Sequence, residues 1–304
     1  MKGSHTTRRV LLALLVAVLV AVAGGFAQAQ QQQQQPPGQF QPTPGQAGKD
    51  VIWLPTAQAL VDKMLDLGKV TAQDVVIDLG SGDGRTVITA AKRGARAFGI
   101  EYNPDMVELS KRAAAEAGVS EKATFEKADL FESDFSKATV ITMFLLPDIN
   151  VRLRPKILDL KPGTRIVSNS FTMGEWTADD TVTVSEDCTT YCTAYLWIVP
   201  AKAAGTWQSV QGELTVTQEF QMATGSVKNG AASTPIANGK LLGDQISFTV
   251  GGAQYKGRVN GNTIDGTVES NGKTEKWSAS RAAKQGPAPG PSTRPVEARC
   301  IAPG

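Results

Sequence analysis

Residues 74–103, DVVIDLGSGDGRTVITAAKRGARAFGIEYN, determine the fold that we predict for this chain. They open with an apolar, β-branched run, which is typical of a strand buried on both faces. Three glycines at alternate positions follow, and residues 85–93 then carry apolar side chains at helical spacing. A second short strand over residues 97–100 ends at the acidic residue Glu101. This order of strand, glycine turn, helix, strand and acid predicts a nucleotide-binding βαβ unit.

Each part of this unit has a chemical reason. Gly80, Gly82 and Gly84 have no Cβ, so a ligand can approach the main chain closely. The helix that begins after the turn offers free N–H groups to a negatively charged group. Glu101 lies 23 residues beyond Asp78, near the spacing of about 20 at which an acid accepts hydrogen bonds from a ribose.

The details of the turn indicate which nucleotide it binds. The dinucleotide fingerprint G-x-G-x-x-G would need a glycine at position 85, where the chain has Arg85. No Gly-Lys-Ser/Thr follows the turn, which excludes the Walker pattern. Asp78, just ahead of the glycines, would repel a pyrophosphate but suits a cationic cofactor that carries an amino acid. The pattern D-x-G-x-G-x-G therefore indicates S-adenosylmethionine.

The stretch VIDLGSGDGRTVITAAKRGARAFGIEYNPDMVELSKRAA resembles the first two motifs of class I S-adenosylmethionine-dependent methyltransferases. DLGSGDGR, with E-x-NP further along, is most similar to the seven-stranded lysine methyltransferases related to the mitochondrial ATP-synthase subunit methyltransferase. The resemblance covers about residues 51–200 and implies an α/β fold with a Rossmann-like seven-stranded sheet. It implies N-methylation of a protein lysine. Methylation of a small molecule or envelope lipid, and a non-catalytic exported binding protein with this fold, are the alternatives.

The resemblance also assigns cofactor-binding roles. We assign to the S-adenosylmethionine site Asp78, Gly80, Ser81, Gly82, Gly84, Glu101, Asn103, Asp129 and Leu130. Asp78 and the glycines would hold the methionine portion, and Glu101 the ribose. Asp129 would contact the adenine amino group, or would be only a solvated turn residue. Residues 53–56 would either line the pocket entrance or pack in the core.

Residues 139–146 form an almost wholly apolar segment, which is typical of a central parallel strand. In amino methyltransferases such a strand leads into the substrate-facing motif, and we therefore assign Phe144, Leu146 and Pro147 to the acceptor. The sequence departs here from the Asn-Pro-Pro-Tyr form used on nucleobases, so we expect no nucleic-acid acceptor. No residue identifies itself as the base that would deprotonate a lysine, and we assign no catalytic residue.

Residues 1–29 have the pattern of an export signal, with Lys2, Arg8 and Arg9 ahead of an apolar run and a small-x-small site at 27–29. The paired arginines resemble the twin-arginine signal. An uncleaved segment would instead associate the chain with a membrane. We expect a periplasmic or otherwise extracytoplasmic protein. Loss of the signal leaves 28 basic and 29 acidic residues, which is no surplus of positive charge for a polyanion.

The composition divides the rest of the chain. We predict a Gln/Pro-rich linker over 30–49, a methyltransferase domain over 50–203, a small all-β domain over 204–281 and a disordered Pro/Gly-rich tail over 282–304. The all-β domain is predicted as an antiparallel sheet or barrel with a binding role or a passive, stabilising one. Its alternating runs are separated by turn pairs, namely Asn229-Gly230, Asn238-Gly239, Gly251-Gly252, Asn260-Gly261 and Asn271-Gly272.

Histidine and cysteine usage narrows the chemistry. The one histidine, His5, lies in the export signal, so the mature chain has no histidine base and no histidine metal ligand. Cys188 and Cys192 lie between two alternating segments, 180–187 and 193–199, which we predict to form an antiparallel hairpin that closes the sheet. In one extended strand their Cα atoms would be about 13 Å apart, too far for a disulfide, whereas across a hairpin loop they could pair. The sequence leaves open whether the two cysteines form a disulfide.

Overall fold

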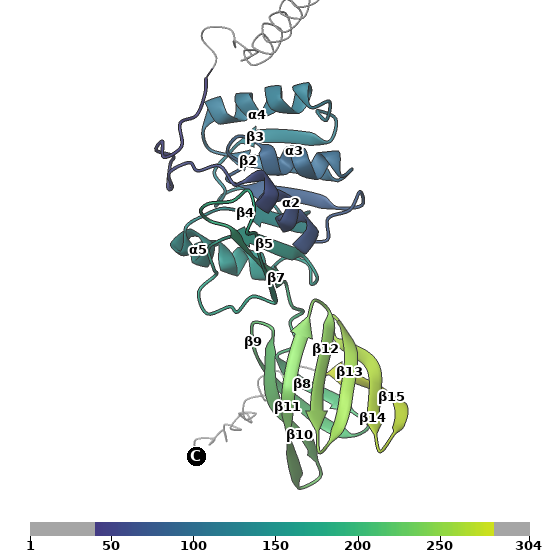
Figure 1. Ribbon diagram of the computed structural model, residues 1–304. Coiled ribbons are helices and arrows are strands. Elements are labelled where there is room, and N and C mark those ends of the chain that lie inside the picture. The colour runs from purple at the N-terminus through teal and green to yellow at the C-terminus, as the bar shows by residue number, and fades with distance from the viewer. Residues whose placement is uncertain (1–39, 283–304) are drawn as a thin grey trace, which may run out of the picture. The chain divides into compact units, whose positions relative to one another are not determined.

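The computed structural model describes residues 40–282, coloured by residue number in Figure 1. The export signal, linker residues 30–39, tail residues 283–304 and Cys300 lie outside the described residues. A seven-stranded sheet has the order β3-β2-β1-β4-β5-β7-β6. Its parallel strands are β1 (Val75–Leu79), β2 (Arg96–Glu101), β3 (Ala123–Lys127), β4 (Val140–Met143) and β5 (Arg165–Asn169). This confirms the predicted Rossmann-like sheet.

An antiparallel pair completes the sheet. β7 (Thr193–Ile198) pairs with β5, and β6 (Asp180–Thr183) pairs with β7 at the edge. In the loop between them Cys188 and Cys192 form a disulfide, with Cα atoms 5.7 Å apart. The predicted hairpin is therefore confirmed, and the disulfide that the sequence left open is formed across its loop.

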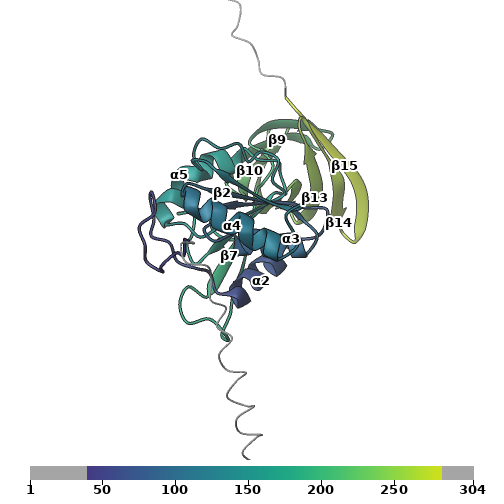
Figure 2. The same cartoon turned by 90° about the horizontal axis from the view of Figure 1, so that it is seen from above.

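Helices cover both faces of the sheet. Side chains of each strand point alternately to the two faces, so each face forms a core with the helices that cover it. They are α2 (Gln58–Leu67), α3 (Arg85–Lys92), α4 (Pro104–Glu116) and α5 (Pro147–Leu158). In β1, Val76 points to the core formed with α2, α3 and α4, whereas Ile77 and Leu79 point to the core formed with α5. Figure 2 shows α5 on the opposite side of the sheet from α2 and α3.

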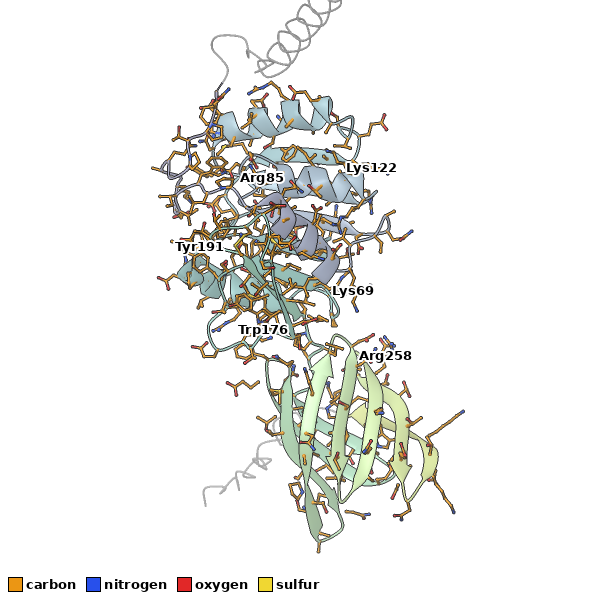
Figure 3. The ribbon with its side chains drawn as sticks, viewed as in Figure 1. Lys69, Arg85, Lys122, Trp176, Tyr191 and Arg258 are labelled. Carbon is orange, nitrogen blue, oxygen red and sulfur yellow. A yellow bond between two sulfur atoms is a disulfide. The ribbon has the colours of Figure 1, made fainter. Side chains whose placement is uncertain are left out.

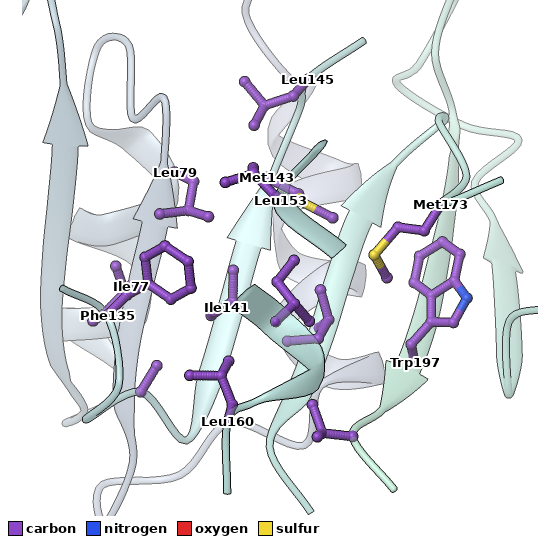
Figure 4. Close-up of a cluster of buried hydrophobic side chains, with 14 of the residues drawn as sticks. Ile77, Leu79, Phe135, Ile141, Met143, Leu145, Leu153, Leu160, Met173 and Trp197 are labelled. Carbon is purple, nitrogen blue, oxygen red and sulfur yellow. The ribbon is translucent and has the colours of Figure 1, made fainter. Parts of the chain in front are cut away.

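The core on the α5 side is the larger of these clusters, and Figure 4 shows it. Ile141 and Met143 of β4 lie at its centre, and Leu153 of α5 and Trp197 of β7 belong to the same cluster, with almost no exposed surface. Burial on both faces explains why 140–143 is uniformly apolar apart from Thr142. The packed strands fix the positions of the loops at their carboxyl ends, where open α/β sheets bind ligands.

The C-terminal part of the chain forms a closed, eight-stranded antiparallel barrel of order β10-β11-β12-β13-β14-β15-β8-β9. Its strands are β8 (Gly205–Ser209), β9 (Gly212–Glu219), β10 (Met222–Asn229), β11 (Ala232–Leu242), β12 (Gln245–Val250), β13 (Ala253–Asn260), β14 (Thr263–Ser270) and β15 (Lys273–Arg281). Buried side chains fill the interior, including Trp207, Phe248, Tyr255 and Trp277. An eight-stranded barrel is just wide enough for such filling.

One predicted turn of the barrel is wrong. Asn238-Gly239 does not separate two strands but lies inside β11, where the pairing with both β10 and β12 shifts register. Asn238 has a left-handed φ of 53°, and a Cβ on Gly239 would lie 2.0 Å from the carbonyl oxygen of Ala223. The pair therefore forms a β-bulge, which uses the same residue types as a hairpin turn.

None of the helices within residues 40–282 combines the length and the hydropathy that are needed to cross a membrane.

Candidate functional site

A cavity of ≈ 590 Å³ lies at the carboxyl ends of β1, β2 and β4, within the size range of small-molecule sites. The residues that we assigned from the sequence and that line it are Asp78, Gly80, Ser81, Gly82, Glu101, Asn103, Asp129, Leu130, Phe144 and Leu146. Gly84 and Pro147 do not line it. Gly84 packs against neighbouring side chains, and Pro147 is the first residue of α5. The roles of all these residues remain predictions.

The glycine turn between β1 and α3 excludes side chains at two positions. Gly82 has φ +53°, and a Cβ there would lie 2.6 Å from Nε1 of Trp53. Gly84 has φ +79°, and a Cβ there would lie 2.8 Å from atoms of Phe125 and Ser110. The indole of Trp53 therefore lies directly against the turn, and glycine is required both for its conformation and for this contact.

Asp78, at position four of β1, is a buried acid at the base of the cavity. Burial raises the pKa of its carboxyl group to about 7; the hydrogen bond that Thr142 Oγ1 donates to Oδ1 at 2.6 Å lowers this pKa, and the carboxylates of Asp83 and Glu101 raise it. A cation bound beside Asp78 would favour the ionised form. The position thus fits the ammonium group of an amino acid.

Glu101 ends β2 and is held by two backbone donors. Oε2 accepts a hydrogen bond from Gly82 N at 2.9 Å, and Oε1 accepts one from Asn103 N at 2.9 Å. Each carboxylate oxygen has a second lone pair for a hydroxyl group. The side chain of Asn103 has a different role, since its Oδ1 accepts from Asp105 N at 2.9 Å and caps α4.

Asp129, in the turn after β3, forms an ion pair that the sequence did not predict. Its Oδ2 accepts a hydrogen bond from Nζ of Lys49, and its Oδ1 accepts one from Phe131 N at 2.9 Å. The Lys49 hydrogen bond holds the pKa of this carboxyl group below its ordinary value. Nζ of Lys49 also lies 4.9 Å from the ring centroid of Tyr102. An adenine amino group at Asp129 would share the carboxylate with Lys49.

The N-terminal segment 46–56 forms a wall of the cavity. Arg85, at the position where a dinucleotide fingerprint has glycine, donates to the carbonyl oxygen of Thr56 at 2.8 Å and pairs with Asp83. Asn169 Nδ2 donates to Thr56 Oγ1 at 3.1 Å. These bonds fasten the segment to the sheet, and part of it, 46–49, belongs to the range that we expected to be linker.

The end of the cavity that follows β4, which we predict to receive the acceptor and call the acceptor end, is apolar and aromatic. Phe144 and Leu146 follow β4, and two residues that the sequence analysis did not assign, Phe171 and Tyr191, also line it. Figure 3 shows Tyr191 at the same end of the strands as Arg85, whereas Lys69 and Lys122 lie at the other end. Neither Phe171 nor Tyr191 belongs to a motif, so only the three-dimensional arrangement identifies them.

The described residues fit S-adenosylmethionine. Asp78 can pair with an ammonium group, Glu101 is fixed as a hydroxyl acceptor, and Ser81 has a buried Oγ with no hydrogen-bond partner among the described residues. Within residues 40–282 no three His, Cys, Asp or Glu side chains gather to hold a metal ion.

The chain is similar to known methyltransferases. Residues 78–180 match the model of the family described as ANTKMT methyltransferase domain. A protein-lysine N-methyltransferase of Saccharolobus islandicus (strain REY15A) is 41% identical over 152 residues, which cover 49% of this chain and 94% of that protein. Adenine nucleotide translocase lysine N-methyltransferase of Mus musculus is 36% identical over 103 residues, which cover 33% of this chain and 45% of that protein.

A solved structure shares similar sequence. The RNA methyltransferase from Salinibacter ruber, in complex with S-adenosyl-L-homocysteine, is 46% identical, with 49% of this chain and 95% of that chain covered and a TM-score of 0.46. The Saccharolobus relative decides the family, because nearly its whole length is matched. The chain therefore belongs to the seven-stranded S-adenosylmethionine-dependent methyltransferases related to the protein-lysine N-methyltransferases.

Proposed function

We propose that this methyltransferase methylates the ε-amino group of a lysine in a protein. The observation that carries the proposal is that one cavity joins the acids Asp78 and Glu101 to an apolar, aromatic end lined by Phe144, Phe171 and Tyr191. The acids suit the polar groups of a cofactor, and the aromatic end suits a long side chain with an apolar stem. The name of the Saccharolobus relative, a protein-lysine N-methyltransferase, supports the same acceptor.

The chain's own residues have to bind and align. Asp78 would hold the cofactor's ammonium group, Glu101 its ribose, and Asp129 its adenine. When bound, S-adenosylmethionine supplies a methyl group that its positively charged sulfur already activates for transfer. Alignment of the acceptor with that group can provide much of the rate acceleration.

The acceptor amine must be neutral before it attacks. At the acceptor end, the described residues that line the cavity come from the end of β4, from α5 and from the later loops. None of them has a carboxylate or an imidazole; they are Met143, Phe144, Leu145, Leu146, Ile149, Phe171 and Tyr191. The proton would therefore leave to solvent, and the methylation rate should rise with pH until the bound amine is neutral.

Radiolabelled S-adenosylmethionine tests the acceptor class. The mature protein is incubated with envelope protein, total RNA and envelope lipid as separate fractions, and the labelled protein is hydrolysed to amino acids. We expect the label in mono-, di- or trimethyl-lysine. Label in the RNA or lipid fraction alone would contradict the proposal. Cofactor binding without labelling of any fraction would favour a non-catalytic binding protein.

We also propose that the protein works outside the cytoplasm. The basic and apolar pattern of residues 1–29 supports export. The Cys188–Cys192 disulfide supports an oxidising compartment, where such bonds persist. Fractionation of cells that express the full chain tests this, with an Arg8→Lys/Arg9→Lys variant as the control for twin-arginine export. Recovery of the unprocessed protein in the cytoplasm would contradict it.

A further inference from the structure

Three aromatic rings touch one another at the acceptor end of the cavity. The ring centroids of Phe144 and Phe171 are 6.0 Å apart, those of Phe144 and Tyr191 are 5.3 Å apart, and those of Phe171 and Tyr191 are 5.8 Å apart. All three residues line the cavity. We call this set the aromatic triad.

The triad is the right size for a small cation. A cation interacts favourably with an aromatic ring when it lies over the face of the ring, within about 6 Å of the centroid. Because the three centroids form a triangle with sides of 5.3–6.0 Å, one ammonium group above the triangle is within that range of every ring. The described charged residues that line the cavity come from segment 46–56, β1, the glycine turn, the start of α3, β2 and the turn after β3. None of them comes from the loops after β4, β5 and β6 that carry the triad, so a cation above the three rings meets aromatic side chains first.

Two members of the triad are fixed by the sheet. Phe144 directly follows β4. The carbonyl oxygen of Phe171 accepts hydrogen bonds from Ser168 Oγ at 2.7 Å and from Asn150 Nδ2 at 3.3 Å, and both donors belong to buried residues. The backbone at Phe144 and Phe171 is therefore held close to the carboxyl ends of β4 and β5.

Tyr191, in contrast, is presented by a loop. It is 44% exposed, lies one residue before Cys192 and has a left-handed φ of 57°. For a non-glycine residue this conformation costs of order 1 kcal/mol or more and persists only where the surroundings impose it. The Cys188–Cys192 disulfide closes the loop at this point. Without the disulfide the loop can relax and move the tyrosine ring away from the two phenylalanines.

We propose that the aromatic triad binds the ammonium or methylammonium head of the acceptor lysine, and that the Cys188–Cys192 disulfide holds Tyr191 in this site. The proposal rests on the function proposed above and adds the residues that recognise the acceptor. A dithiol reductant would break the S–S bond to give two thiols and would itself become a disulfide. Acceptor binding is then sensitive to reduction, while cofactor binding is not.

Binding to the mature protein loaded with S-adenosylhomocysteine tests the triad without methyl transfer. The probes are Nα-acetyl-Nε-trimethyl-lysine amide and its neutral isostere, in which a carbon atom replaces the charged nitrogen. We expect the cation to bind about 5–30-fold more tightly, as cation–π contacts predict. Tyr191→Phe should keep this ratio, and Tyr191→Ala should lower it at least threefold.

Matched variants separate the triad from the rest of the cavity. Tyr102 lines the same cavity and is 49% exposed but contacts none of the three rings in the described structure, so Tyr102→Ala should keep the cation preference. Phe171→Leu should lower it like Tyr191→Ala. The affinity for S-adenosylhomocysteine checks that each variant is folded. Equal binding of cation and isostere by the unaltered protein, or an unchanged ratio in both triad variants, would overturn the proposal.

A separate comparison tests whether the Cys188–Cys192 disulfide is needed for acceptor binding. Dithiothreitol should weaken binding of the trimethyl-lysine probe several-fold in the unaltered protein and leave the affinity for S-adenosylhomocysteine unchanged. The Cys188→Ser/Cys192→Ser variant should bind the probe weakly from the start and should not respond, although it retains Cys300. A response of equal size in this variant would assign the effect to another thiol. If the protein prefers the cation but methylates no lysine, the proposed function is contradicted and the role of the triad stands. If it methylates lysine without preferring the cation, the proposed function stands and the role of the triad is contradicted.

Discussion

Glu101 and Gly82 are joined across the cofactor end of the cavity, because Oε2 of Glu101 accepts a hydrogen bond from Gly82 N at 2.9 Å. Asn103 N donates to the other carboxylate oxygen. The acid that would meet the ribose is thus immobilised by backbone before a ligand arrives. When a site is already formed, binding does not spend free energy on ordering its side chains, and the affinity for the ligand is higher.

The first prediction concerns Glu101→Ala. Removal of a charged acceptor for two hydroxyl groups should weaken S-adenosylmethionine binding by about 1.5–3 kcal/mol, measured by titration calorimetry. Glu126→Ala is the matched control, because Glu126 is exposed on β3 and does not line the cavity. Unchanged affinity in Glu101→Ala would show that the ribose is held elsewhere.

A second prediction follows from the raised pKa of Asp78. An ammonium group pairs with the ionised carboxylate, so the dissociation constant of S-adenosylmethionine should increase as the pH falls below about 7, the pKa of Asp78. The increase should approach at most about tenfold per pH unit. Asp78→Asn should bind weakly and with little pH dependence. A dissociation constant that is flat between pH 5.5 and 8 in the unaltered protein would contradict this role.

The raised pKa of Asp78 also predicts that the stability of the ligand-free protein depends on pH. Folding raises the pKa of Asp78 from 3.8 to about 7, so the folded chain binds this proton more tightly than the unfolded chain does. The stabilisation is therefore present at acid pH and is lost as the pH rises to about 7 and above. Asp78→Asn should increase the free energy of unfolding at pH 8 by on the order of 2–4 kcal/mol and should have little effect near pH 4. Denaturant titrations at the two pH values measure this, and equal effects at both would exclude an ionisation-linked cause.

Gly82→Ala tests the contact between the glycine turn and Trp53. The added methyl group would displace the indole, since its position is 2.6 Å from Nε1 of Trp53, and it would strain a φ of +53°. Gly118→Ala has a similar strain, with φ +69°, but nothing within 4 Å of the added carbon. Both variants should lose about 1 kcal/mol of stability from strain. Only Gly82→Ala should also reduce S-adenosylmethionine binding, and equal binding by both would show that Trp53 does not shape the site.

Gly239→Ala tests the bulge in β11. The added carbon would lie 2.0 Å from a backbone oxygen of β10, whereas Gly252→Ala, in the turn before β13, meets nothing within 4 Å. We expect Gly239→Ala to destabilise the barrel by roughly 2–4 kcal/mol and Gly252→Ala by about 1 kcal/mol. The midpoints of denaturant unfolding, followed by tryptophan fluorescence, compare the two. Equal midpoints would mean that the bulge tolerates a side chain.

The sequence was sufficient for the fold and for most of the residues that line one end of the cavity. The buried run at 75–77, the alternate glycines and the spacing to Glu101 are local patterns, and local patterns specify a βαβ unit directly. The same holds for the antiparallel hairpin that completes the sheet. The Asn238-Gly239 prediction failed because a left-handed Asn followed by glycine suits a bulge as well as a turn.

The acceptor end could not be found in the same way. Phe171 and Tyr191 are 27 and 47 residues beyond Phe144, and no periodicity connects them. They meet because parallel strands bring their carboxyl ends to one edge of the sheet, which is a property of the assembled topology. The ion pair between Lys49 and Asp129 is likewise a long-range contact, across 80 residues of sequence.

The wall that residues 46–56 contribute to the cavity affects where the chain can be shortened. A truncated protein beginning at Asp50, the boundary that composition alone predicts, would lack Lys49 and the strand-like bridge between Ala47 and Ile52. Such a fragment would keep every strand of the sheet, yet it would lose the part of the cavity wall that residues 46–49 form. Work on the complete cavity therefore requires a chain that starts before Gln46, the first residue that lines it.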